Sequence, residues 1–235
     1  MLLFLREEPV ALLEVERKRY LIVADLHIGI TKELKSHGIY LPSEGETLVK
    51  KLNDVGKKTN VKNLIILGDL KHNISGAKKE EFLEVKKFLS RLDFDKIIII
   101  KGNHDGKIEN IAKNVNKKIK IEKRFIKIKD TLLTHGHISI KENINVKRII
   151  IAHVHPYIRI IDRLKASYYE RVWLRYEDDR EIIIMPNFNE LCGATIVNEQ
   201  ELIGPIARKI NKKEFEVYLL DGTYLGKIKD FEANE

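Results

Sequence analysis

The sequence predicts an α/β protein (α+β by some schemes), built as a four-layer α/β/β/α sandwich of two mixed β-sheets flanked by helices. Two observations lead to this fold class. In the first half of the chain, short apolar runs alternate with amphipathic stretches, which is the strand–helix–strand order of a parallel sheet. In the second half, strand-like segments follow one another with turns between them. Two packed sheets with helices on their outer faces satisfy both halves.

The first half of the chain should form helices and parallel strands. The stretch that begins at Ser43 has the apolar spacing of a helix, with Ser43 as N-cap and Glu46 completing a capping box. Short apolar runs that end at Gly68 and before Gly102 have the composition of buried strands. The expected segments are the strands Val10–Val15, Lys18–Ala24, Val61–Leu67 and Ile97–Ile100, and the helices Ser43–Lys57 and Ala77–Leu92.

The second half should supply most of the remaining strands. Lysine alternates with isoleucine over Lys118–Lys129, which is the period of a strand with one exposed face. Asp221 and Gly222, between two apolar segments, predict a β-hairpin. The expected strands are Thr131–Thr134, Arg148–Ala152, Tyr157–Asp162, Ser167–Tyr176, Glu181–Met185, Phe215–Leu220 and Thr223–Ile228.

Bulk composition bounds the class of protein. The chain has 235 residues, 43% of them hydrophobic, which is enough for the core of one large domain spanning residues 1–235. It shows no signal peptide and no apolar stretch near the ~18 residues that a membrane span needs. The single cysteine, Cys192, can form no internal disulfide. These features indicate a soluble, cytoplasmic protein with no membrane partner.

The charge balance leaves two interpretations open. There are 43 Lys and Arg residues against 35 Asp and Glu, a formal net charge of +8. A basic excess suits a polyanionic partner such as nucleic acid. Lys, Glu and Ile are also abundant together, as in heat-adapted proteins, and in that case the excess says little about partners.

Seven of the eight histidines fall in five short clusters, most of which come directly after an apolar strand. Open α/β sheets place ligands at the carboxyl ends of their strands, so these clusters should meet in one site. One histidine at a strand end is usually structural, but five such clusters together are difficult to explain in that way. The clusters are Asp25–His27, Gly68–His72, Gly102–Asp105, His135–His137 and His153–His155.

The candidate ligands predict a pair of divalent metal ions. Carboxylates, imidazoles and one amide oxygen suit ions such as Mn²⁺, Fe²⁺ or Zn²⁺, and the lack of clustered cysteine argues against a structural zinc site. The candidates exceed the needs of one ion, whereas two ions sharing a carboxylate would use them all. Two ions about 3.5–4 Å apart can clamp the attacking and leaving oxygens of an in-line phosphoryl displacement.

The order of these clusters resembles the calcineurin-like metallophosphoesterase superfamily over residues 25–155. The pattern is Asp-x-His, Gly-Asp-x-x-His, Gly-Asn-His-Asp, His-Gly-His and His-x-His. His72 in the second motif is similar to the Mre11/SbcD nuclease branch. The segment Met185–Asn189, with Gly193 and Asn198, resembles a smaller prokaryotic group of Mre11/SbcD-related phosphoesterases.

The resemblance implies a role for each site residue. His104 would protonate the leaving oxygen or stabilise the transition state, oriented by Asp105, and His72 would contact the phosphate or position the substrate. In the fourth cluster we favour His135 as the ligand over His137. The ions would be Mn²⁺ foremost, with Fe²⁺, Zn²⁺ or Ni²⁺ as alternatives. One ion would be held by Asp25, His27 and His155, and Asp69 would bridge to a second ion held by Asn103, His135 and His153.

Two weaker patterns have both a functional and a structural interpretation, and we favour the structural one for each. Asn187 and Asn189 could line the site, but asparagine is also a common turn residue. A row of aromatic and basic side chains could bind single-stranded nucleic acid, or could belong to a half-buried strand whose arginines reach the surface. The row consists of Tyr169, Arg171, Trp173 and Arg175.

The sequence best fits a dinuclear-metal phosphodiesterase or nuclease, which hydrolyses phosphodiester bonds by in-line attack of a metal-bridging hydroxide. DNA and RNA are candidate substrates. A small-molecule phosphomonoesterase or cyclic-nucleotide phosphodiesterase is the alternative, because it would use the same core. A catalytically inactive scaffold is disfavoured because all five motifs are intact. A homodimer is one option that the sequence leaves open.

Overall fold

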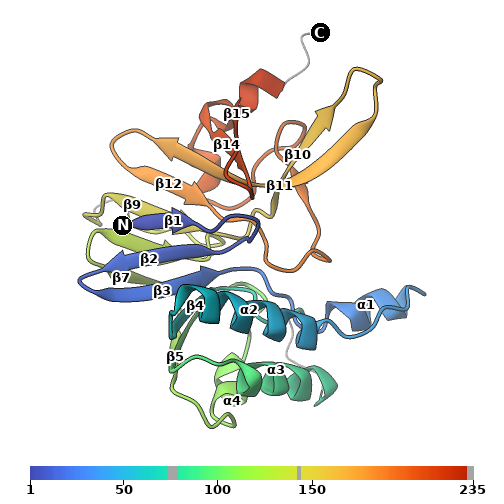
Figure 1. Cartoon of the computed structure of the whole chain (residues 1–235), viewed down its shortest axis with the longest axis vertical. Coiled ribbons are helices and arrows are strands. Elements are labelled where there is room, and N and C mark those ends of the chain that lie inside the picture. The colour runs from blue at the N-terminus through green and yellow to red at the C-terminus, as the bar shows by residue number, and fades with distance from the viewer. Residues whose placement is uncertain (74–78, 142–143, 232–235) are drawn as a thin grey trace.

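The computed structural model describes residues 1–73, 79–141 and 144–231. In these residues two mixed β-sheets pack face to face, and the larger α-helices group on the outer side of one sheet (Figure 1). The predicted arrangement of two sheets flanked by helices is therefore confirmed.

The first sheet has six strands in the order β1-β2-β3-β4-β5-β6. Its first three strands pair antiparallel, and β3 to β6 run parallel, as the strand–helix–strand alternation predicts. Strand β1 extends the sheet beyond the two opening strands that the sequence indicates. The strands are β1 (Leu2–Phe4), β2 (Ala11–Val15), β3 (Lys18–Val23), β4 (Asn63–Leu67), β5 (Lys96–Ile100) and β6 (Ile119–Glu122).

Helices cover the outer face of the first sheet. Leu52 of α2 and Phe88 of α3 are buried in a shared core with the outward-facing side chains of β3, β4 and β5. The helix predicted at Ala77–Leu92 is present as α3, and its residues 77–78 lie outside the described residues. The α-helices are α1 (Ile30–Ser36), α2 (Gly45–Thr59), α3 (Lys79–Arg91) and α4 (Ile108–Ala112).

The predicted capping box at the start of α2 is wrong. The helix begins at Gly45, and its N-cap residue Glu44 makes no capping hydrogen bond. Ser43 Oγ instead donates to Glu84 of α3. Glu46 forms ion pairs with two basic residues of α3. Contacts between the two helices therefore use the side chains that a local capping pattern would have used.

The second sheet has nine strands, with the main order β13-β10-β11-β12-β9-β8-β7 and with β14 and β15 added beside β11. Strands β8, β9 and β12 run parallel in its centre. The stretch Lys118–Lys129 forms two strands rather than one, and these lie in different sheets. The strands are β7 (Phe125–Ile128), β8 (Thr131–Thr134), β9 (Arg148–Ile151), β10 (Pro156–Ile161), β11 (Ser167–Glu177), β12 (Glu181–Ile184), β13 (Thr195–Ile196), β14 (Glu216–Leu219) and β15 (Tyr224–Lys227).

The outer face of the second sheet is covered differently from that of the first. Its core includes Ile206, Ala207, Phe215 and Ile228, which lie in or beside three short 3₁₀ helices. Every α-helix of the described residues, by contrast, lies before β6 in the chain. The 3₁₀ helices are η1 (Ala207–Lys209), η2 (Lys212–Glu214) and η3 (Ile228–Phe231).

The layer between the two sheets contains Trp173, which is fully buried and stacks on Phe4 with ring centroids 4.2 Å apart. Arg175, two residues further along β11, pairs with Glu181 and Glu216. The aromatic and basic row on this strand is thus largely occupied by internal contacts, which supports its structural interpretation.

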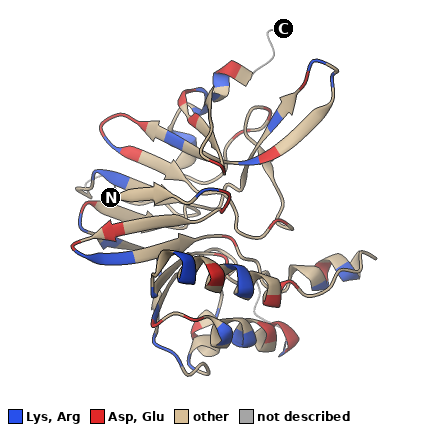
Figure 2. Cartoon of the chain, in the orientation of Figure 1, with Lys and Arg blue, Asp and Glu red and all other residues tan. Residues whose placement is uncertain are grey.

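Basic and acidic residues are interspersed along the ribbon of both halves of the molecule rather than separated by sign (Figure 2). In the described part of the chain, no helix has both the length and the apolar character needed to cross a membrane.

Candidate metal centre

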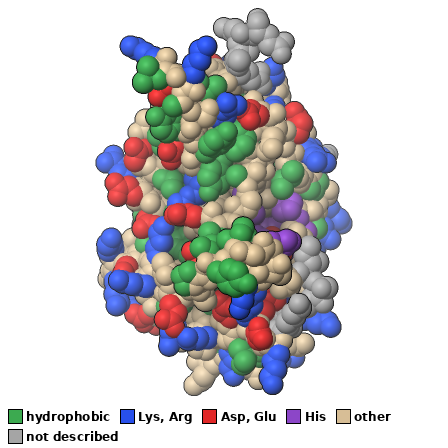
Figure 3. All heavy atoms as spheres, turned by 90° about the vertical axis from the view of Figure 1, so that its right-hand side faces the viewer, with side chains coloured by type: hydrophobic (Ala, Val, Ile, Leu, Met, Phe, Trp, Pro, Cys, Tyr) green, Lys and Arg blue, Asp and Glu red, His purple; other side chains and the backbone are tan. Residues whose placement is uncertain are grey.

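The five predicted clusters come together at one edge of the sandwich. Three of them follow the parallel strands β3, β4 and β5 of the first sheet, and two follow β8 and β9 of the second. Backbone hydrogen bonds join neighbouring loops, because Asp25 N donates to Gly68 O and Ala152 N donates to His135 O. Histidine side chains reach the surface together on this side of the molecule (Figure 3). The site is therefore built across both sheets.

An unusual backbone conformation marks the loops of the site. A positive φ is uncommon for residues other than glycine, and such residues cluster at functional sites. Five of the predicted metal ligands adopt it. Their φ angles are 54° for Asp25, 43° for His27, 48° for Asp69, 72° for His153 and 50° for His155. These left-handed turns direct several polar side chains from short loops into a single space.

Two glycines allow the loops to approach one another. A Cβ at Gly102 would lie 2.0 Å from Asp69 Oδ1, and a Cβ at Gly68 would lie 2.3 Å from His135 Cδ2. Both distances are far below van der Waals contact. Any side chain at either position would therefore displace a candidate ligand.

The first ligand group consists of Asp25, His27 and His155, whose candidate ligand atoms all lie within 4.8 Å of one another. His155 Nε2 lies 3.4 Å from Asp25 Oδ1, and its other ring nitrogen faces the carbonyl oxygen of Gly193 at 2.8 Å. Asp25 and His27 are buried, so the group lies below the surface.

The second ligand group consists of Asp69, His135 and His153, again with ligand atoms within 4.8 Å of one another. His135 is fully buried, and its Nε2 lies 3.0 Å from Asp25 Oδ1 and 3.4 Å from Asp69 Oδ2. His27 Nε2 of the first group is 3.6 Å from Asp69 Oδ2. Asp69 thus lies between the two groups.

The geometry favours His135 over His137 as the candidate ligand of the fourth cluster. His137 Nδ1 faces His135 Nδ1 at 3.0 Å, which places His137 behind the ligand rather than against the carboxylates. Asn103 lies in the loop after β5, between Gly102 and His104, and is exposed. Its assignment as a ligand stays a prediction.

The residues of both groups fit divalent metal ions. His27 Nε2 and His155 Nε2 are buried, and neither atom has a hydrogen-bond partner within the described residues. A buried polar atom without a partner costs about 1–3 kcal/mol, and coordination of a metal ion would remove that cost. Imidazole and carboxylate donors in this proportion suit Mn²⁺, Fe²⁺ or Zn²⁺.

The ionisation of His27 and His153 supports the same interpretation. Burial lowers the pKa of His27 to about 3 and, together with the charge of His135, that of His153 to about 4. Both rings are therefore neutral at pH 7, which is the form that binds metals. Burial opposes ionisation of Asp25, but His155 and His135 outweigh it and hold the pKa of Asp25 well below its usual value.

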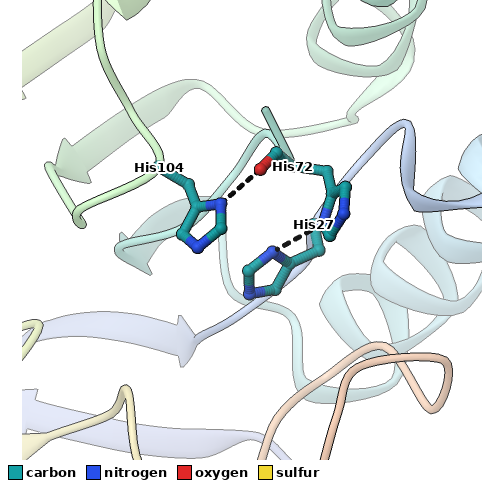
Figure 4. A group of neighbouring side chains, drawn as sticks. All are labelled: His27, His72 and His104. Atoms are coloured by element: carbon teal, nitrogen blue, oxygen red, sulfur yellow. Dashed lines mark hydrogen bonds between the residues drawn. The ribbon is translucent and has the colours of Figure 1, made fainter. Parts of the chain in front are cut away.

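A third group of side chains lies beside the first ligand group and consists of His27, His72 and His104 (Figure 4). His104 Nδ1 faces the carbonyl oxygen of His72, and its Nε2 lies 3.9 Å from Asp69 Oδ2. His72 Nδ1 lies 3.2 Å from His27 Nδ1. Because His72 and His104 remain partly exposed next to the buried ligands, a substrate can reach both.

The expected contact between Asp105 and His104 is corrected by the structure. Asp105 is fully buried and accepts hydrogen bonds from the backbone N–H groups of Leu70, Lys71 and Gly102 at 2.9–3.2 Å. The backbone carbonyl of His72 orients the His104 ring instead. Burial and the nearby Asp69 raise the pKa of Asp105 to about 6. Asp105 thus holds the loops around Asp69 in place.

Asn189 supports the loop of the first ligand group, a role that the sequence leaves open. It is buried, its Nδ2 donates to Leu26 O at 2.9 Å, and its backbone N–H donates to Asp25 O. Cys192 Sγ lies 3.4 Å from the same Asp25 oxygen. The segment after β12 therefore packs behind the site rather than lining it.

Glu33 is a further site residue that no sequence motif indicates. It lies on α1, and its Oε2 is 2.7 Å from His72 Nε2. Glu33 follows His27 by six residues and is the fourth residue of α1. None of the five sequence clusters includes this position.

Comparison with known proteins places the chain in a family. The profile of the calcineurin-like phosphoesterase family matches residues 18–212. The crystal structure of Pseudomonas putida nuclease MPE is 19% identical in sequence and covers 92% of this chain and 100% of its own, with a TM-score of 0.56. Yfce, a phosphoesterase from E. coli, is 13% identical over 88% of this chain and 97% of its own, with a TM-score of 0.41.

No curated protein matches the chain. The likeness to the nuclease, at this identity, shows a shared fold. The family profile spans more than half of the chain and covers all five clusters. The chain therefore belongs to the calcineurin-like phosphoesterase family.

Proposed function

We propose that this protein is a dinuclear-metal phosphodiesterase that acts on nucleic acid. The observation that carries the proposal is the pair of ligand groups that meet at Asp69, each with one carboxylate and two imidazoles, beside two partly exposed histidines. A site that holds two ions next to an accessible proton donor suits hydrolysis of phosphate esters.

Each ligand group would hold one ion, with Asp69 shared and Asn103 completing the second group. Mn²⁺ is the ion we favour, because carboxylate, amide and imidazole donors are mixed and thiolates are lacking. When bound, two such ions would lower the pKa of a water molecule and withdraw charge from the phosphate.

The remaining steps belong to side chains of the chain itself. The His104 ring is held at Nδ1 by a backbone carbonyl, which leaves Nε2 unoccupied, and in its doubly protonated form the ring would give the Nε2 proton to the leaving oxygen. His72 lies beside it, with ring centroids 5.7 Å apart, and would help to position the substrate. General acid catalysis of this kind contributes on the order of 10²–10⁴-fold to a rate.

Three features support a phosphodiester substrate and nucleic acid in particular. The chain carries a net charge of +8, and counterion release favours binding of a polyanion by such a protein. His72 stands where the Mre11/SbcD branch has a histidine, a relation that we include in the proposal. Pseudomonas putida MPE, which shares the fold, is named a nuclease.

The test is Mn²⁺-dependent hydrolysis of bis(p-nitrophenyl) phosphate beside the matching monoester, followed by oligonucleotides. Wild-type protein should cleave the diester, and Asp69→Asn should abolish cleavage because both ligand groups lose their shared carboxylate. Asp95→Asn is the matched control and should keep full activity, because Asp95 is exposed and precedes β5, whereas the site lies after the carboxyl end of that strand.

Each alternative function has its own outcome in this assay. Turnover of the monoester alone would favour a phosphomonoesterase, and cleavage of nucleotides without oligonucleotides would favour a cyclic-nucleotide phosphodiesterase. Folded protein that is inactive with every divalent ion would favour a scaffold.

A further inference from the structure

A chain of three side chains leads from the surface of α1 to the first ligand group. Glu33 Oε2 lies 2.7 Å from His72 Nε2, and His72 Nδ1 lies 3.2 Å from His27 Nδ1. The rings of His27 and His72 meet edge to face, with centroids 5.3 Å apart and planes at 65°. Figure 4 shows the contact between the two rings. The far nitrogen of His27, Nε2, is buried and has no hydrogen-bond partner in the described part of the chain.

The order of hydrogen-bond donors along this chain follows from the carboxylate at its outer end. An ionised carboxylate only accepts hydrogen bonds, so His72 must carry a proton on Nε2 to bond Glu33. With one proton on its ring, His72 then presents a lone pair at Nδ1. His27 must in turn carry its proton on Nδ1 in order to donate to that lone pair. The lone pair of His27 is thereby left on Nε2, which points toward Asp69.

We propose that Glu33 is a positioning residue, which acts through His72 to fix the His27 tautomer that binds metal. Ligating histidines usually donate their second N–H to a carboxylate or carbonyl, and such outer contacts orient the ring and raise its basicity. Here a second histidine stands between the carboxylate and the ligand. The inference rests on the metal ligation by His27 that is part of the proposed function.

The surroundings of Glu33 argue against a merely structural role. The Glu33 side chain is 54% exposed, whereas His72 is 14% exposed and His27 is buried. An exposed ion pair on a helix contributes little to stability, in the range of about 0–1 kcal/mol. The contact therefore matters mainly for what it does to the imidazole rings beneath it.

The hydrogen-bonded relay Glu33–His72–His27 is tested first in metal-free protein at neutral pH, by long-range ¹H–¹⁵N correlation spectra of the histidine rings. In wild-type protein, His27 should carry its proton on Nδ1 and His72 on Nε2. Alanine has the highest helix propensity of all residues, so Glu33→Ala should keep α1 helical. The variant should nevertheless lose this fixed pattern of ring protons. Glu33→Gln keeps an acceptor oxygen and should restore it in part.

Calorimetric titration with Mn²⁺ gives a second readout that does not depend on turnover. Loss of an outer contact of this type costs about 10–100-fold in metal affinity, so Glu33→Ala should weaken one of the two binding events by that factor. Glu46→Ala is the matched control, because Glu46 is an exposed glutamate on α2 that also forms ion pairs, with Lys87 and Arg91 of α3.

Two results would overturn the relay: a proton on Nε2 of His27 in the wild type, or unchanged spectra and Mn²⁺ affinity in Glu33→Ala. Diester hydrolysis is measured separately. A wild type with the expected tautomers and the expected Mn²⁺ titration, but without hydrolysis of any ester, supports the relay and refutes the proposed function.

Discussion

The two ligand groups contain the same donors but are held in place by different chemistry. The turn that carries Asp25 is anchored by the neutral amide of Asn189, which bonds the Leu26 carbonyl. The turn after Asp69 is anchored by Asp105, a buried carboxylate that bonds two of its backbone N–H groups. One group therefore depends on an ionisable support, and the other does not.

The two anchors also differ in where they come from. Asn189 lies 163 residues beyond Leu26 and follows a strand of the second sheet, so it ties the first ligand group across the sandwich. Asp105 lies only 35 residues beyond Leu70 and follows a strand of the same sheet. Two similar groups of candidate ligands can thus be held by packing between layers or by an acid within one layer.

The largest expected effect comes from removing one ligand from each group. His155→Ala should abolish one Mn²⁺-binding event and His153→Ala the other, and each should lower diester hydrolysis by more than the ~100-fold that bounds the loss of outer contacts. Titration calorimetry measures the Mn²⁺-binding events, and turnover of the diester measures hydrolysis. His37→Ala, at an exposed histidine outside the clusters, is the control. Two ions bound by either variant would show that the division into two groups is wrong.

A smaller effect is expected from Asn189→Ala, which removes the neutral anchor. The change leaves the buried Leu26 carbonyl without its partner, so the free energy of unfolding should fall by about 1–3 kcal/mol. Denaturant unfolding measures this loss. Asn110→Ala, at an exposed site, should be close to neutral. If both variants unfold like the wild type, Asn189 does not anchor the first ligand group.

The smallest expected effect is a difference in how the stability contributed by each anchor depends on pH. Burial and Asp69 raise the pKa of Asp105 from 3.8 to about 6 on folding. A carboxyl group with a raised folded pKa contributes stability that is fully present below pH 3.8 and is lost as the pH rises through about 6. In EDTA, the stability of the wild type relative to Asp105→Asn should therefore fall between pH 4 and 7.

Denaturant unfolding of the wild type and of Asp105→Asn at several pH values measures this difference in stability, because every other ionisable group is present in both proteins. The wild type and Asn189→Ala should instead differ by a constant amount over the same range. A difference between wild type and Asp105→Asn that rises with pH would mean that Asp105 is held ionised in the folded protein.

The local sequence carries much of the fold and of the candidate site. Apolar runs followed by glycine or aspartate locate the parallel strands, and the carboxyl ends of such strands meet at one edge for geometric reasons. The grouping of Asp25 with His155, 130 residues apart in number, followed from the resemblance. The split of Lys118–Lys129 between two sheets could not be predicted, because both strands have the same alternating period.

The supports of the site are invisible in the sequence for a different reason. Asp105, Asn189 and Glu33 contact backbone groups or rings whose positions depend on left-handed turns and on packing between elements. Ser43 shows the converse, since its local capping pattern is not realised and its side chain contacts the neighbouring helix instead. Motifs name the ligands, but tertiary structure decides what holds them.

The construction of the site across both sheets has a consequence for how the protein folds. Asp25 meets His135 over 110 residues of chain and the backbone of His153 over 128. Contacts of such long range form late, because the entropy of closing large loops must be overcome first. A partly folded chain with only one sheet in place would hold an incomplete set of ligands. If each group holds one ion, as proposed, retention of both ions would therefore report the final docking of the two sheets.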